Sequence, residues 1–106
     1  MYRPMPRLFA ALTLAVASAA AYSLTIELPK ETAQLQPGPH LDLATARCMI
    51  CHSADYIATQ PPNLPRATWA AEVAKMKKVY GAPIADEDIE PLTEYLAKTY
   101  GDERGK

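Results

Sequence analysis

The sequence predicts a small all-α domain, and three observations support this fold class. Apolar residues recur at the three- and four-residue spacing of a helix in three separate segments. Glycine or proline stands near the ends of these segments, where helices commonly stop. The chain shows no succession of alternating stretches that would build a sheet. Its 106 residues allow one such domain, because globular domains commonly have about 100–150 residues.

The first helix is expected near the middle of the chain. One face of it carries Leu41, Ala44, Cys48 and Cys51. Asp42 near its start favours the positive end of the helix dipole. Residues 53–65 are then expected to form a loop, because the run Gln-Pro-Pro-Asn at 60–63 opposes regular structure.

Two more helices are expected, over about residues 66–80 and about residues 88–100, each followed by glycine. Their apolar faces are Trp69, Val73, Met76 and Tyr80 in the second helix, and Ile89, Leu92, Leu96 and Tyr100 in the third. Pro91 fits only in the first turn of a helix, so the third helix should begin close to Asp88.

Residues 1–21 have the three parts of a secretory signal peptide. Arg3 and Arg7 make the start basic, an uncharged stretch rich in Ala and Leu follows, and small residues offer cleavage near Ala19 or Ala21. An uncleaved anchor is the alternative, since about 20 apolar residues cross a bilayer. We favour cleavage, because the second half of the stretch is weakly apolar. The mature chain is therefore expected in the periplasm, without a membrane span.

Residues 22–40 form an expected N-terminal arm, and residues 41–106 the expected domain. Leu24, Ile26 and Leu28 alternate with polar residues, which suits an extended segment that contacts the core or another protein. The mature chain has nine Lys and Arg against twelve Asp and Glu, a net charge of −3. The lack of a basic excess argues against nucleic-acid binding.

Both cysteines fall in the block Cys48-Met49-Ile50-Cys51-His52, which is the attachment pattern of c-type haem. Two thiols three residues apart can each bond one vinyl group on the same edge of a porphyrin. His52 is then held beneath the iron and offers its imidazole as the proximal ligand. Covalent attachment takes place outside the cytoplasm, in agreement with the leader. We therefore predict one covalent haem c.

Three other uses of these residues fit less well. A thioredoxin-like pair would follow a strand in a βαβ unit, and no such pattern surrounds Cys48. A zinc site would have to use all of the Cys and His in the chain, and the adjacent Cys51 and His52 suit one tetrahedral ion poorly. A disulfide between Cys48 and Cys51 would close a very small loop and stabilise little.

The sixth iron ligand has three candidates, namely Met76, His40 and a lysine. Met76 is the only methionine after the motif, and it lies on the apolar face of the second expected helix. A thioether opposite histidine raises the reduction potential, which suits an electron acceptor. The same placement fits an ordinary core methionine, and the residues alone leave both uses open. His40 is more simply a surface histidine in a proline-rich turn.

Other residues near Met76 allow two interpretations. Three lysines flank it on the outer side of the helix: Lys75, Lys77 and Lys78. They could steer an acidic partner toward an exposed haem edge, but a solvated helix face is the simpler interpretation. Three aromatic residues could line a haem pocket or belong to an ordinary core: Tyr56, Trp69 and Tyr80.

Several segments carry a family resemblance. They are residues 48–57 with the haem motif, Thr59-Gln60-Pro61-Pro62, Trp69, residues 72–76 and residues 79–84. Together they resemble the small monohaem cytochrome c subunit of bacterial sulfite dehydrogenase. Residues 95–100 resemble the final helix common to class I cytochromes c. The likeness covers about residues 40–100.

The resemblance implies a class I cytochrome c-like helical domain wrapped around one covalent haem. Cys48 and Cys51 would be the thioether positions, with His52 as the proximal and Met76 as the distal iron ligand. The chain would be an electron-transfer subunit and not itself an enzyme. It would form a heterodimer with a molybdenum-cofactor catalytic subunit that oxidises sulfite to sulfate, and would pass electrons to a soluble cytochrome c. The pattern of the arm, apart from the resemblance, would fit a segment that lies on this catalytic subunit and adds a strand to it.

Three other classes stay open at this point. A stand-alone soluble cytochrome c would serve several partners without a stable complex. A haem enzyme or gas sensor would need an open distal position on the iron, with Met76 unbound. A zinc-binding structural module would hold zinc without iron.

Overall fold

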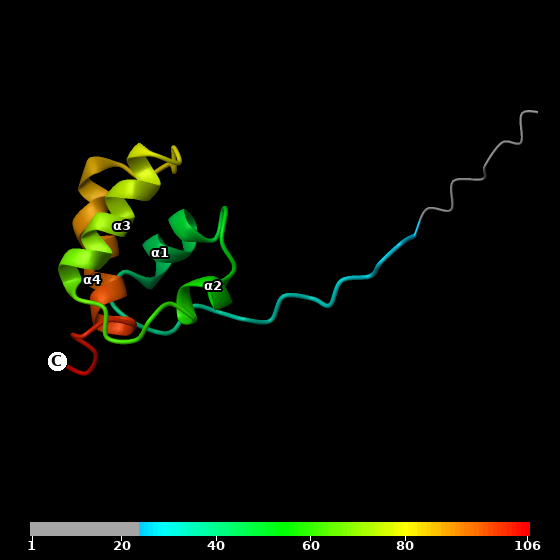
Figure 1. Ribbon diagram of the computed structural model, residues 1–106, viewed down its shortest axis with the longest axis horizontal. Coiled ribbons are helices and arrows are strands. Elements are labelled where there is room, and N and C mark those ends of the chain that lie inside the picture. Colours follow the sequence, from blue (N-terminus) through cyan, green and yellow to red (C-terminus); the bar gives the residue numbers. More distant parts are fainter. Residues whose placement is uncertain (1–23) are drawn as a thin grey trace, which may run out of the picture.

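The computed structural model describes residues 24–106, which form a small helical domain preceded by an extended arm (Figure 1). The helices of this part of the chain are α1 (Leu41–Cys48), α2 (Ala54–Ala58), α3 (Arg66–Lys78), the short 3-10 helix η1 (Asp86–Asp88) and α4 (Ile89–Thr99). Residues 24–106 contain no β-strand, so the prediction of an all-α domain is confirmed. None of the described helices has the length and apolar character needed to cross a membrane.

Helix α4 lies at the centre of the packing. It packs most extensively against α3 and also contacts α1 (Figure 1). Leu92 and Leu96, predicted for its apolar face, are buried, and Tyr95 beside them is fully buried. The buried apolar residues as a group are Leu35, Ala44, Ala54, Ile57, Trp69, Val73, Ile84, Leu92, Tyr95, Leu96 and Ala97. The core is thin and is built from residues on all four α-helices.

The third predicted helix has the start that its proline requires. Pro91 is the third residue of α4, in the first turn, where its missing N–H needs no partner. The chain turns sharply after α4 at Gly101. A Cβ there would lie 2.7 Å from the Leu64 carbonyl oxygen and 2.8 Å from the Trp69 Nε1 atom. Only glycine therefore lets the chain after α4 pass this close to α3.

Three expectations about the helices are wrong in part. The sequence predicts Cys51 on one face of the first helix, but α1 ends at Cys48 and Cys51 lies in the turn that follows. The sequence predicts a loop over residues 53–65, but residues 54–58 form α2. The Ser53 side chain caps this helix by accepting a hydrogen bond from the Tyr56 N–H at 3.4 Å. The prolines come only after α2 ends, so they do not oppose it. The second predicted helix stops at Lys78, and Tyr80 is 70% exposed instead of lying on the buried face.

The arm leaves the domain as an extended chain (Figure 1). Residues 24–34 have no regular secondary structure, and Leu35 is the first buried residue. Two tyrosine hydroxyls bind the backbone of Gln36. Tyr95, within α4, donates to its carbonyl oxygen at 2.7 Å, and Tyr100, directly after α4, accepts from its N–H at 2.9 Å. The predicted leader, residues 1–21, lies outside the described residues.

Candidate functional site

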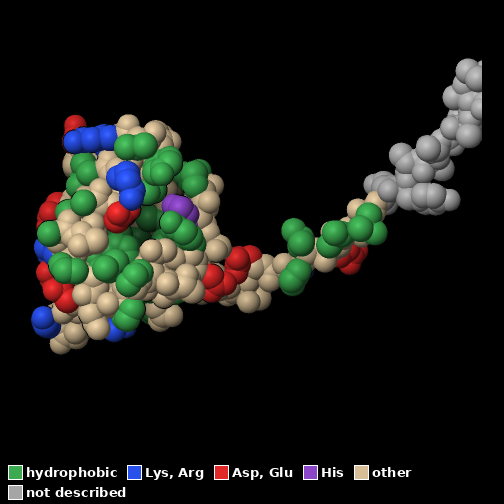
Figure 2. Space-filling model, in the orientation of Figure 1, with side chains coloured by type: hydrophobic (Ala, Val, Ile, Leu, Met, Phe, Trp, Pro, Cys, Tyr) green, Lys and Arg blue, Asp and Glu red, His purple; other side chains and the backbone are tan. Residues whose placement is uncertain are grey.

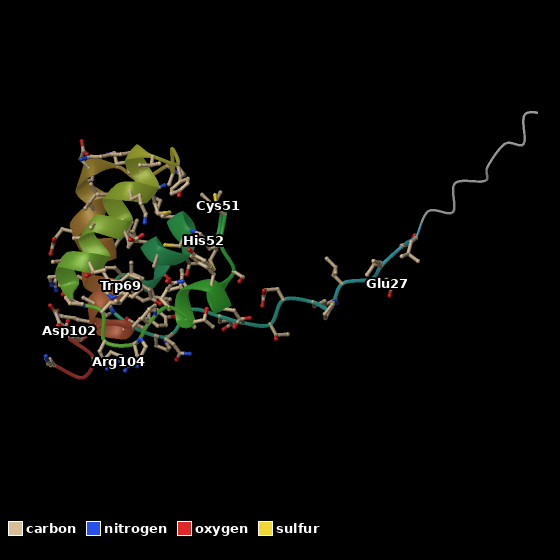
Figure 3. All side chains as sticks on the ribbon, viewed as in Figure 1. Glu27, Cys51, His52, Trp69, Asp102 and Arg104 are labelled. Atoms are coloured by element: carbon tan, nitrogen blue, oxygen red, sulfur yellow. The ribbon has the colours of Figure 1, made fainter. Side chains whose placement is uncertain are left out.

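The two cysteines lie at and just after the end of α1. Cys48 is the last residue of this helix, and the N–H groups of Cys51 and His52 both donate to its carbonyl oxygen, at 3.3 and 3.1 Å. This turn places Cys48 half-buried and Cys51 exposed, with both thiols free. Burial raises the pKa of the Cys48 thiol. Figure 3 shows Cys51 and His52 together on one side of the domain.

His52 is followed by the short helix α2, and this arrangement orients its ring. Tyr56 lies four residues later, and its phenol ring stacks on the imidazole with centroids 4.3 Å apart and an interplanar angle of 3°. Within residues 24–106, no hydrogen bond involves either ring nitrogen of His52. The imidazole is therefore oriented by stacking and its nitrogens are available to a ligand.

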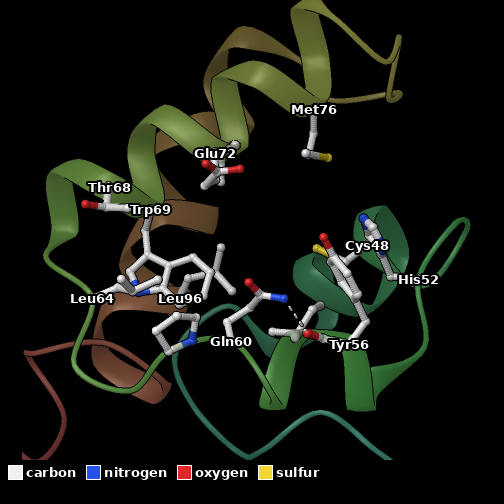
Figure 4. Close-up of a pocket in the computed structure, with 13 residues that line it drawn as sticks. Cys48, His52, Tyr56, Gln60, Leu64, Thr68, Trp69, Glu72, Met76 and Leu96 are labelled. Carbon is white, nitrogen blue, oxygen red and sulfur yellow. Dashed lines mark hydrogen bonds between the residues drawn. The ribbon is translucent and has the colours of Figure 1, made fainter.

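Met76 lies on α3, across a hollow from the cysteine motif. In Figure 4 its side chain extends from α3 toward the side of the hollow that holds Cys48 and His52. An inner cavity of about 270 Å³ is lined by all three of these residues and is walled further in by Trp69. The structure thus brings the predicted proximal and distal ligands together around one cavity, although they are separated by α2 and most of α3 in the sequence.

An outer cavity of about 600 Å³ adjoins the inner one and shares several of its walls. Cys48, His52 and Met76 line both, and Cys51 lines the outer one. Cavities that bind cofactors have volumes of about 300–1,000 Å³. The space beside the motif is therefore of the size that a cofactor needs.

The donor set in these cavities fits a c-type haem. One imidazole and one thioether are a ligand pair found on haem iron. Cys48 and Cys51 line the same cavity as the imidazole of His52, as attachment of both thiols at one porphyrin edge would require. The other walls are largely apolar and come from three helices: Ile57 on α2, Trp69 and Val73 on α3, and Leu96 on α4. Cys48, Cys51, His52 and Met76 are thus the residues that could hold the group.

The alternative sixth ligand His40 is placed elsewhere. It does not line either cavity, and its Nε2 atom lies 3.1 Å from a Glu94 carboxylate oxygen on α4. The surface role favoured by the sequence agrees with this position. No group of three or more His, Cys, Asp or Glu residues in the described part of the chain is arranged to hold a metal ion, so a zinc site of that kind is not formed there.

The lysines beside Met76 are mostly neutralised within the domain. Lys75 pairs with Glu72, which raises the pKa of the lysine. Lys77 pairs with Asp86 at 2.6 Å and lowers the pKa of that carboxyl. Of the three, Lys78 alone has no ion pair within residues 24–106. This pairing favours the interpretation of a solvated helix face over that of a basic docking rim.

Exposed apolar side chains also lie at the outer cavity, beside the charged lining residues Arg47, Glu72 and Lys75. Outside the arm, the large hydrophobic side chains exposed in the described residues are Ile50 (61%), Tyr56 (52%), Val79 (69%) and Tyr80 (70%). All of them line the outer cavity except Val79, which precedes Tyr80 in the chain. Figure 2 shows hydrophobic side chains around the hollow that holds the histidine. We call these four residues the apolar rim.

Two lining residues, Gln60 and Glu72, fall in segments that carry the family resemblance but were not predicted as site residues. Gln60 lines the inner cavity, and its amide donates to the Tyr56 carbonyl oxygen at 2.9 Å. Glu72 lines both cavities, one helical turn before Met76. The four-residue spacing from Glu72 to Met76 indicates that both lie on one face of the helix, but the sequence does not show that this face borders a cavity. Tyr56, Trp69 and Tyr80, by contrast, are all lining residues, as the sequence allowed.

Comparison of the chain with protein-family models and with curated protein sequences finds no match. The function therefore has to be argued from the residues of this site.

Proposed function

We propose that this chain is a periplasmic c-type cytochrome that transfers single electrons and does not itself act on a substrate. Haem bound here would supply reversible one-electron chemistry at its iron. Cys48 and Cys51 would hold it covalently, and His52 and Met76 would be the protein ligands of its iron. The fold would then be that of a class I cytochrome c, with the helices wrapped around the haem.

The observation that carries this proposal is the convergence of His52 and Met76 on one cavity that is also lined by Cys48. In the sequence Cys48 and His52 share one five-residue block, whereas Met76 lies 24 residues after His52 and could be either a ligand or a core residue. Met76 is partly buried, packs against the hydrophobic core and also lines this cavity, so its thioether is placed where a ligand of the iron would be needed. An iron with two protein ligands has no open position, which suits electron transfer better than catalysis or gas binding.

The upstream donor follows from the family resemblance. We propose that the molybdenum-cofactor catalytic subunit of a sulfite dehydrogenase supplies the electrons, that the two chains form a heterodimer, and that a soluble cytochrome c accepts the electrons. The apolar rim supports a protein partner, because three of its four exposed apolar side chains line the cavity in which the haem would lie. A stand-alone carrier with several partners is the alternative, and it would form no stable complex with one enzyme.

The first experiment is the visible spectrum of the protein, oxidised and reduced, after maturation in a bacterial periplasm. We expect sharp low-spin bands on reduction, haem that resists acid-acetone extraction, and a far-red methionine–iron band on oxidation. A high-spin spectrum would keep the haem but remove Met76 as a ligand, and would favour a haem enzyme or gas sensor. Protein with zinc and no iron would contradict the proposal altogether.

A further inference from the structure

The arm differs from the rest of the chain in how its apolar residues are placed. Leu24, Ile26 and Leu28 are 82%, 67% and 81% exposed, while Thr25 and Glu27 alternate with them. In an extended chain this spacing puts the three apolar side chains on one face. Residues 24–28 contain neither Gly nor Pro, and Pro29 follows. The segment therefore has the pattern of a strand without a sheet.

The backbone of this segment is also unpaired. In residues 24–32, no N–H or carbonyl group makes a hydrogen bond to another described residue. Within the described chain, the first such bond in the arm is from the Ala33 N–H to the Glu31 side chain, at 2.9 Å. An extended segment with free backbone groups can add to the open edge of a sheet, where the backbone bonds give affinity and alternate side chains give specificity.

The arm is fastened at its base. Leu35 is buried, and both backbone groups of Gln36 are bound by the hydroxyls of Tyr95 and Tyr100. Gly38 passes so close to Thr99 on α4 that a side chain there would clash. The twelve residues from Leu24 to Leu35 can extend about 40 Å from this anchor at the rise of a strand. The anchored arm can thus reach a neighbouring protein while the domain stays in place.

We propose that residues 24–28 bind a protein partner as an added strand on an exposed edge of its β-sheet, with Leu24, Ile26 and Leu28 packed on an apolar strip beside that edge. In Figure 2 the arm leaves the domain on the side of the hollow that holds the histidine, so one partner can contact both. The choice of the electron-donating subunit as this partner rests on the proposed function.

Two other occupants fit the arm less well. A second copy of the chain offers no sheet, because its described residues contain no strand, and two arms alone would form a two-stranded ribbon that is marginal in water. A membrane surface would favour a basic segment. The arm instead carries Glu27 and Glu31 against Lys30.

The test measures binding of the haem-containing chain to the purified molybdenum catalytic subunit of the same organism. Removal of residues 24–32, or Ile26→Asp, should weaken the complex at least about tenfold. Thr25→Asp places the same charge on the other face and should weaken it less than about threefold. Backbone amides of residues 24–28 should become protected from hydrogen exchange in the complex. Unchanged spectra and melting of the variants confirm that the domain itself is intact.

The contrary outcomes can be told apart. If removal of residues 24–32 leaves the affinity unchanged while sulfite still reduces the haem through the subunit, the arm proposal is wrong and the proposed function stands. If the full chain is neither bound nor reduced, the donor is wrong, and so is the strand assignment to it. Arm-dependent dimers of the chain alone, or arm-dependent binding to phosphatidylglycerol vesicles, would assign the arm to a second copy or to a membrane instead.

Discussion

The imidazole of His52 lies parallel to the phenol ring of Tyr56, with centroids 4.3 Å apart. Tyr56 lies four residues after His52. Ser53 caps α2, which begins at Ala54, and the first turn of this helix brings the Tyr56 ring over the imidazole. Histidines that bind metals usually have their second ring nitrogen oriented by a hydrogen bond. In the described part of the chain, the imidazole of His52 is oriented by the stacked ring of Tyr56 and not by such a hydrogen bond.

Replacement of Tyr56 tests this orienting role. Tyr56→Leu should lower the free energy of unfolding of the haem protein by about 1 kcal/mol, which is typical of an aromatic pair. It should also broaden the low-spin electron paramagnetic resonance signal, because the imidazole plane would vary. Tyr56→Phe keeps the ring and is the matched control, so both properties should stay close to those of the native protein. Equal effects of Leu and Phe would show that the ring stack has no orienting role.

On the proposed function, Met76→Ala should keep the covalent haem but lower its reduction potential, because the thioether that favours reduced iron would be lost. The reduced variant should bind carbon monoxide readily, whereas the native protein should bind it slowly or poorly. Met49→Ala is the control, since Met49 lines neither cavity beside the motif. A potentiometric titration with the spectrum recorded at each step measures both variants. An unchanged potential in Met76→Ala would make this residue a wall of the cavity only.

If the proposed function is correct, the apolar rim predicts how the proposed electron donor associates with the domain. Tyr80→Ser should slow reduction by the catalytic subunit about tenfold, as loss of an exposed aromatic contact does at many interfaces. Lys78→Gln should change it less than about threefold, because a single exposed charge is largely screened. Stopped-flow reduction at low and physiological ionic strength measures both. A steep loss of rate with added salt would restore the lysines as the docking determinant.

The C-terminal tail predicts a dependence of stability on pH. Arg66 at the start of α3 donates to both carboxylate oxygens of Glu103, at 2.8 and 2.9 Å, and holds the pKa of this carboxyl below its ordinary value of 4.5. The unfolded chain therefore binds this proton more readily than the folded one. The pair stabilises the fold above pH 4.5, and this contribution is lost as the pH falls through the lowered folded-state pKa.

Thermal melting between neutral pH and pH 3 measures this dependence. Glu103→Gln should lower the melting temperature at neutral pH and flatten its decline in acid. Glu87→Gln is the control, because Glu87 is exposed and makes no ion pair within the described residues. Parallel acid profiles for native protein and Glu103→Gln would contradict the contribution of this pair.

Gly101→Ala should destabilise the domain by about 1–3 kcal/mol, since it forces a Cβ into a packed site. The new atom would lie within 3 Å of Leu64 and Trp69. Gly105→Ala is the comparison, because nothing lies within 4 Å of a Cβ there, although its φ of +73° carries a smaller backbone cost. Guanidinium titration measures both. A smaller loss for Gly101→Ala than for Gly105→Ala would show that the chain yields easily at this turn.

The sequence by itself determined the helical class, the approximate positions of α1, α3 and α4, and the Cys-x-x-Cys-His pattern. Helical periodicity and the spacing of Cys48, Cys51 and His52 are local properties, so they can be read without knowledge of the fold. It also identified Met76 as a candidate ligand, and the arm as an extended segment. It did not predict α2, because the prolines that follow this short helix indicate a loop, whereas Ser53 as a helix cap is a weaker local signal.

Tertiary structure alone decided which residues meet. Packing of α3 on α4 places Met76 at a cavity shared with His52 and Cys48, and no local pattern specifies that meeting. The tertiary structure also brings Asp86 next to Lys77. This ion pair balances the charge of one of the three lysines that lie close together on α3. Contacts between residues far apart in the chain depend on the mutual orientation of helices, and a single sequence encodes that orientation only through the packing of the whole core.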